Sequence, residues 1–233
     1  MLAVAAQADG DRGWPVLESA LKAAGGRDKL AAVRDLTFDL ESRMVTPMGE
    51  MKLTSRNQAV LPDTVRQDIT APVGRMTVAF TASEGWRKSP QGVEKIAPGQ
   101  LRLTLAHLHN VNILFRPPSD PKAVRWVAEE TLDGRAADVI EIRQPDAEPL
   151  RLWVDRAAGE VRKRAYRIEN SAGGMAAVEE FLSDYRQVGG LRLSFQVREM
   201  RDGKFARESA TSNMQINTGI KAEALVQEFR QAR

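Results

Sequence analysis

The sequence has no cysteine among its 233 residues and only two histidines. The first absence excludes a disulfide scaffold, a thiolate zinc site and cysteine catalysis. A chain of this length buries enough surface to fold without such staples. His107 and His109 lie two residues apart in a predicted helix, a spacing that does not bring both rings to one helix face, so we predict no metal site.

Long hydrophobic runs are also missing, and no segment approaches the ~20 apolar residues of a membrane-spanning helix. The first eight residues form a short, alanine-rich stretch. They fit two interpretations: the small-residue end of a secretory signal, or an ordinary frayed terminus. The first would place the mature domain outside the cytoplasm. We assign residues 1–12 to a disordered or signal-remnant terminus and 13–233 to one domain.

Neither sign of charge dominates, because 34 basic residues face 31 acidic ones and leave a formal charge of +3. The signs alternate along most segments, as in Arg198-Glu199-Met200-Arg201-Asp202. A nucleic-acid footprint requires clustered basic residues, so we predict no nucleic-acid partner. The densest basic run, Arg162-Lys163-Arg164 with Arg167, fits either a solvated strand or a surface for lipid headgroups.

Catalytic motifs are equally scarce. The sequence contains no Gly-x-Ser-x-Gly elbow and no glycine-rich phosphate loop. Neighbouring carboxylates such as Glu129-Glu130 and Glu179-Glu180 point to opposite sides of a strand, so neither pair can share a substrate. We therefore predict that the protein is not an enzyme and needs no cofactor or metal.

What the sequence does contain is mostly two-residue alternation. A helix is predicted from Pro15 to the Gly25-Gly26 pair, with a short helical turn over 28–33. From Leu36 onward apolar and polar residues alternate, which is typical of a strand that is wet on one face. The same pattern recurs in strands near 51–53, 65–69, 76–80, 86–89, 124–132, 137–143, 150–155, 161–168, 178–185, 191–200 and 205–216.

Two helices interrupt or close this pattern. Pro98 opens a segment whose leucines recur at helical spacing and predict a broadly apolar helix with its stripe over 101–115, ended by a proline-rich loop. A last helix covers 222–230. We predict a mainly β (α+β) fold: a single curved antiparallel sheet of about 10–11 strands that forms an incomplete barrel around a helical lid.

Each strand of such a sheet offers one apolar face that must be covered. The interior is then either filled by side chains or left hollow for a ligand, and the sequence leaves both open. The four tryptophans (Trp14, Trp86, Trp126 and Trp153) fit core, rim or cavity lining. The candidate lining of an apolar cavity consists of Phe38, Leu40, Met76, Val78, Phe80, Leu105, Leu108, Val111, Leu193 and Phe195.

Two stretches resemble a known family. Leu150-Arg151-Leu152-Trp153-Val154-Asp155 continues through Gly159 into basic residues, and Phe181-Leu182-Ser183-Asp184-Tyr185 leads through Gly189-Gly190 into a strand. Both resemble the back half of the outer-membrane lipoprotein-sorting superfamily of LolA, LolB and LppX. The entry helix with Gly25-Gly26 and the run Pro47-Met48-Gly49-Glu50-Met51 are similar to a branch found as tail domains after zinc peptidases. The Asp155–Gly159 segment also predicts a bulged hairpin turn with a positive-φ glycine.

The resemblance implies a half-open barrel with an apolar cavity for acyl chains, with the 101–115 helix as part of the lid. We expect a periplasmic or cell-envelope carrier of a lipid or acyl-chain ligand, held by burial of its methylenes. Its partners would be a lipid or acylated protein and a membrane or envelope protein, and we expect a monomer. The alternative is a non-catalytic interaction or regulatory module, peptidase-associated or sensing envelope stress, whose core is filled.

Overall fold

The computed structural model describes residues 12–47, 49–143, 148–169 and 174–231. In this part of the chain thirteen strands belong to one antiparallel sheet. The chain forms two compact units: a first unit of residues up to Ala31 together with Ile113–Lys204, and a second unit of Ala32–Asn112 together with Phe205–Arg233. The predicted terminus at 1–12 lies outside the described residues except for Arg12.

The first unit contains two helices, a short 3-10 turn and an antiparallel run of strands in the order β7-β8-β9-β10-β11-β12. Neighbours in this order follow each other in sequence, so the run is a meander. Its elements are α2 (Gly13–Ala23), α3 (Arg27–Ala31), η1 (Pro121–Ala123), β7 (Val124–Leu132), β8 (Arg135–Ile142), β9 (Leu150–Asp155), β10 (Val161–Glu169), β11 (Met175–Val188) and β12 (Leu191–Arg201).

Helix α2 covers β7 and β8 because its apolar stripe points at them. Leu17 and Leu21 are fully buried, and so are Ile140 and Ile142 of β8. Gly13 permits this contact, since a Cβ at that position would lie 2.7 Å from the carbonyl oxygen of Val124. The glycine thus lets helix and strand backbones approach closely.

The turn between β9 and β10 has the predicted form. The Asp155 carboxylate accepts hydrogen bonds of 2.9 Å from the backbone N–H groups of Ala157 and Ala158. Gly159 follows with a φ of +70° and packs against α2, where a Cβ would lie 2.9 Å from the Cβ of Ala23. The register of β10 against β9 shifts between Val161 and Lys163, so the bulged hairpin is confirmed.

The basic run of β10 is paired with acidic residues of β11. Lys163 forms an ion pair with Glu179, and Arg164 forms one with Glu180. Because they are consecutive, the two glutamates lie on opposite faces of β11, as predicted. Arg164 and Glu180 are buried, so for Arg164 both interpretations, the solvated strand and the surface for lipid headgroups, are wrong.

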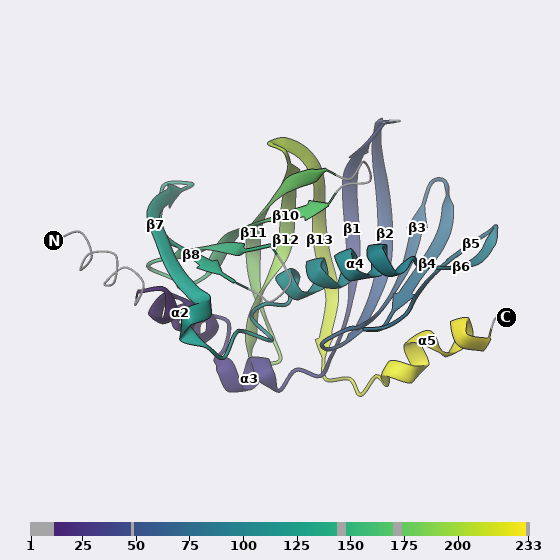
Figure 1. Ribbon diagram of the computed structural model, residues 1–233, viewed down its shortest axis with the longest axis horizontal. Helices are drawn as coiled ribbons and strands as arrows, with labels where there is room; N and C mark the ends of the chain where they lie inside the picture. The colour runs from purple at the N-terminus through teal and green to yellow at the C-terminus, as the bar shows by residue number, and fades with distance from the viewer. Residues whose placement is uncertain (1–11, 48, 144–147, 170–173, 232–233) are drawn as a thin grey trace. The chain divides into compact units, whose positions relative to one another are not determined.

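The second unit is an antiparallel run in the order β6-β5-β4-β3-β2-β1-β13, with two helices. Neither unit's strand order returns to its first strand, so neither closes into a barrel. The elements are β1 (Asp35–Thr46), β2 (Gly49–Val60), β3 (Thr64–Ala71), β4 (Gly74–Phe80), β5 (Gly85–Ser89), β6 (Gly92–Lys95), α4 (Pro98–Val111), β13 (Lys204–Ile216) and α5 (Ala222–Gln231), as Figure 1 shows.

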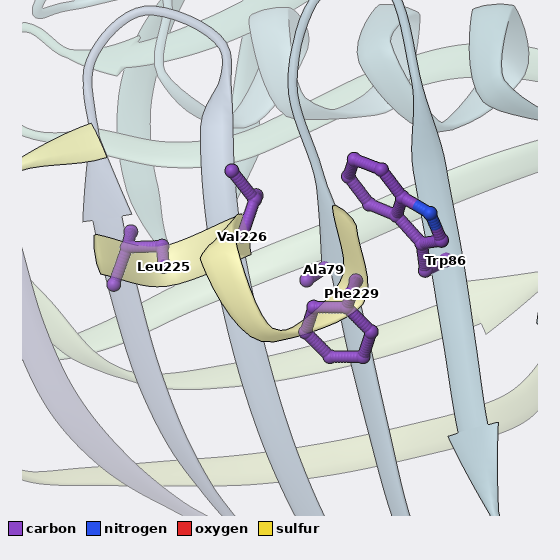
Figure 2. Close-up of a cluster of buried hydrophobic side chains, with 5 residues drawn as sticks. All are labelled: Ala79, Trp86, Leu225, Val226 and Phe229. Carbon is purple, nitrogen blue, oxygen red and sulfur yellow. The ribbon is translucent and has the colours of Figure 1, made fainter. Parts of the chain in front are cut away.

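Helix α5 covers one face of this unit's sheet, at β2, β3 and β4. Its buried Leu225, Val226 and Phe229 form a cluster with Ala79 of β4 and Trp86 of β5 (Figure 2). The rings of Trp86 and Phe229 stack with centroids 5.8 Å apart. Trp86 is therefore a core residue, one of the three roles open to it from the sequence.

The mainly β, antiparallel, open architecture predicted from the sequence is confirmed, with thirteen strands in the described residues in place of 10–11. The predicted helix is confirmed at its start, where Pro98 opens it, and is wrong at its end, because α4 covers Pro98–Val111 and does not reach Phe115. Pro98 begins the helix, since proline is suited to its first turn. Asn112 ends it, and Phe115 is buried outside the helix.

Replacing Phe229 by alanine should destabilise the second unit by about 3 kcal/mol, because the ring is buried against Trp86 and leaves a cavity. Urea unfolding followed by circular dichroism would measure the loss. Gln227→Ala on the exposed side of α5 is the matched control. Equal stability of the two variants would contradict the packing of α5.

The carboxylate of Asp35 ties the start of β1 to the chain between β13 and α5. It accepts hydrogen bonds from Thr218 N (2.7 Å), Thr218 Oγ1 (2.7 Å) and Gly219 N (3.0 Å). Burial acts to raise the pKa of Asp35, but these hydrogen bonds together outweigh it and hold the pKa below its ordinary value.

A carboxyl group whose pKa is lower in the folded than in the unfolded protein stabilises the fold at pH values above its unfolded pKa of about 3.9. This contribution is lost as the pH falls through the pKa of the folded state. Asp35→Asn should therefore cost about 1.5–3 kcal/mol at neutral pH. The difference in unfolding free energy between this variant and the wild type should become smaller below about pH 4. Unfolding free energies across pH, with the exposed Asp28→Asn as control, test this; a difference independent of pH would refute it.

Candidate apolar binding face

The strand register of the second unit sorts its side chains into two faces. Residues paired directly across antiparallel strands point to the same side, and the side alternates along each strand. Asp39, Glu41 and Arg43 of β1 lie on the face that α5 covers. The row of Asp39 runs through Arg56, Asp68 and Thr77 to Lys88 of β5, which forms an ion pair with Glu228 of α5.

The opposite face is predominantly apolar, and we call it the apolar face. It consists of three cross-strand rows over β1, β2, β3 and β4. The rows are Leu36-Ala59-Val65-Phe80, Phe38-Asn57-Gln67-Val78 and Leu40-Ser55-Ile69-Met76.

Among the apolar residues of this face, only those at one end are buried, although the polar Ser55 and Asn57 in the other two rows are buried as well. Leu36, Ala59 and Phe80 in the first row are buried. In the other two rows Phe38, Leu40, Ile69, Met76 and Val78 are all half-buried, so each still exposes apolar surface. Apolar side chains that lie on the apolar side of a strand and are still half-buried can bury more surface against a further apolar partner, which is favourable.

Helix α4 belongs to the same unit and contacts the first-row end of the face at two places. The Leu101 side chain lies over the Phe80–Gly85 pair, where its Cδ1 is 3.3 Å from the position of a Cβ on Gly85. At the second place, Nε2 of His109 lies 2.6 Å from Oδ1 of Asp63 in the β2–β3 turn, which adjoins the Ala59–Val65 pair of the same row. Between them the leucines at 103, 105 and 108 are half-buried.

The ten residues predicted to line a cavity are divided between the units. Eight lie in the second: Phe38, Leu40, Met76, Val78 and Phe80 on the apolar face, and Leu105, Leu108 and Val111 on α4. Leu193 and Phe195 belong to β12 of the first unit. The first five are brought together on one face, and the role of all ten as ligand-binding residues stays a prediction.

The sequence prediction missed the polar residues of the apolar face. Asn57 is buried there, its Nδ2 donating to Oγ of Ser55 (3.0 Å), and Gln67 donates from Nε2 to Oδ1 of Asn57 (2.9 Å). The signal was present in β2 and β3, where polar residues stand at positions that alternation assigns to the apolar side. Only the register, which the sequence did not supply, shows that they are neighbours.

The described residues also bear on metal sites and membrane-spanning helices. No group of three or more potential metal ligands gathers there. No helix among the described residues is long and apolar enough to cross a membrane. His109 serves as a partner of Asp63, and its neighbour His107 lies half-buried on α4.

Comparison with known proteins finds relatives by structure alone: no family model and no curated protein matches the sequence. A LolA superfamily protein from Nitrosomonas europaea aligns with a TM-score of 0.63 at 13% identity, covering 93% of this chain and 98% of that one. A structure described as an outer membrane lipoprotein-sorting protein domain, from Vibrio parahaemolyticus, gives 0.60 at 12% identity, covering 94% and 98%. A DUF1329 family protein from Desulfovibrio piger gives 0.56 at 14% identity, covering 94% and 98%.

These similarities cover nearly the whole chain and define the class of fold. The protein has the fold of the LolA-like, lipoprotein-sorting structures, as the resemblance in its sequence predicted. Identities of 12–14% are too low to carry more than the fold. The narrower similarity to tail domains of zinc peptidases stays a prediction.

Loss of the His109–Asp63 contact should loosen α4. His109→Ala should speed amide hydrogen exchange in residues 98–111 about twofold, since an exposed pair of this kind contributes roughly 0.5 kcal/mol. Arg102→Ala, an exposed change on the same helix, is the control and should leave exchange unchanged. Unaltered exchange in the His109 variant would show that this contact does not hold the helix.

Proposed function

We propose that the protein is a carrier or binding protein for a lipid or other acyl-chain ligand, which lies on the apolar face of the second unit beside α4. The observation that carries the proposal is the set of half-buried apolar side chains on that face. An acyl chain is the occupant that matches them, because each methylene removed from water contributes ~0.8 kcal/mol.

The leucines of α4 extend this apolar surface. Leu105 and Leu108 are half-buried, as are the residues of the face itself. The similarity to a lipoprotein-sorting domain supports an acylated protein or a lipid as the ligand. A non-catalytic role follows from the same proposal, because burial of a hydrocarbon chain needs shape and apolar area and no reacting group.

The cellular setting is part of the proposal. A carrier of acyl chains between membranes works in the periplasm or cell envelope, and the similarity to an outer membrane lipoprotein-sorting domain supports this location. The partners would be the acylated ligand and a membrane or envelope protein that delivers or accepts it. We propose a monomer that binds no nucleic acid.

Native mass spectrometry of purified protein, followed by solvent extraction, tests the function directly. We expect a co-purifying acyl compound, or uptake of a fluorescent fatty acid at one molecule per chain. Purified protein that carries no acyl compound and takes up no fatty acid would refute the carrier hypothesis. The remaining hypothesis would be an interaction or regulatory module with a filled core.

A charge placed on the apolar face should weaken uptake. Met76→Glu should lower fatty-acid affinity at least about tenfold, because the carboxylate would have to be desolvated by the bound chain. Thr70→Glu, an exposed change on the face that α5 covers and opposite Arg75, is the matched control. Equal affinities in fluorescence titrations of the two variants would place the ligand elsewhere.

A further inference from the structure

The side chain of Gln67 is polar at the centre of the apolar face. In its row it stands between Asn57 and Val78, and on its own strand the same face carries Val65 and Ile69. A glutamine in such surroundings must satisfy its amide by hydrogen bonds or keep it in water. Its hydrogen bonds therefore indicate what it is able to bind.

Asn57 holds Gln67 in place. Asn57 is buried and donates from Nδ2 to the Oγ (3.0 Å) and the carbonyl oxygen (3.2 Å) of Ser55. Its Oδ1 accepts the hydrogen bond from Nε2 of Gln67 at 2.9 Å. The carboxamide of Asn57 is thereby committed on both sides, and it fixes the end of the Gln67 side chain.

The carboxamide of Gln67 has one further N–H and an acceptor oxygen. Within the part of the chain that the structure describes, neither has a protein partner. Gln67 is half-buried, so its side-chain groups lie partly open to solvent at the surface where the ligand is proposed to lie. A bare hydrocarbon chain laid over them would remove their water and replace none of its hydrogen bonds.

We infer that Gln67 is a specificity-determining residue that donates a hydrogen bond to the carbonyl oxygen of an ester- or amide-linked acyl ligand. The inference rests on the proposed function and deepens it. The chain of such a ligand would lie over the neighbouring apolar residues, Ile69 and Met76, while its carbonyl satisfies the free N–H of Gln67.

Charge on the same row favours a neutral linkage over a free carboxylate. The cation that follows in this row is Arg87, which pairs with Val78 from the next strand. Its guanidinium is engaged by Glu94 at 3.0 Å. Gln67 itself is uncharged, so the row offers a hydrogen bond without a net positive charge.

The experiment compares two ligands with the same number of carbon atoms, methyl dodecanoate and tridecane, as competitors of bound N-phenylnaphthylamine, with dodecanoate as a third competitor. The wild type should bind the ester more tightly than the alkane or the acid. Gln67→Leu should lower ester affinity about tenfold, the effect of losing one hydrogen bond, and leave tridecane affinity unchanged or higher.

Gln58→Leu is the matched control, because it makes the same change on the adjacent strand but on the face that α5 covers. Gln67→Met is a second variant of unbranched shape, and retained tridecane binding reports that each variant is folded. An unchanged ester affinity, an equal loss for ester and alkane, or preference for dodecanoate would overturn the role of Gln67 while acyl binding stands. If no competitor displaces the probe from the wild type, the proposed function fails together with the inference.

Discussion

The architecture of the second unit depends on the pairing register of β1 through β4. Because side chains alternate, this register decides at once which residues form the apolar face and which meet α5. A slip of one residue in β3 would send Val65 and Ile69 to the α5 side and bring Arg66 and Asp68 among apolar neighbours. The ion pair of Arg66 with Asp68, together with that of Arg66 with Glu228 on α5, holds these charges on their own side.

Much of this arrangement could be predicted from the sequence. Two-residue alternation located nearly every strand, and the glycine after Asp155 identified a bulged turn. Alternation also assigned Asp39 and Phe38 to opposite faces, since that depends only on their being neighbours in a strand. These features are local, and local chemistry specifies them.

What could not be predicted depends on contacts distant in sequence. The hydrogen bond from Gln67 to Asn57 requires the register of β2 against β3, and the assignment of Leu193 to a different unit from Leu40 requires the complete topology. The face carrying Asp39 was expected to be wet throughout. Helix α5 covers part of this face because Trp86 and Ala79 form an apolar patch among its charged residues. The patch departs from the alternation of apolar and polar residues, and its role is clear only once its partner Phe229 is known.

The sequence order of the second unit has a consequence for how it is made. Strands β1–β6 are synthesised before the intervening segment Ile113–Lys204 of the first unit, and β13 and α5 follow that segment. Trp86 and Ala79 therefore wait until the intervening segment Ile113–Lys204 of the first unit has been made before Phe229 can cover them. The nascent chain carries an uncovered indole throughout that interval, and exposed apolar surface of this kind makes an incomplete fold prone to aggregation.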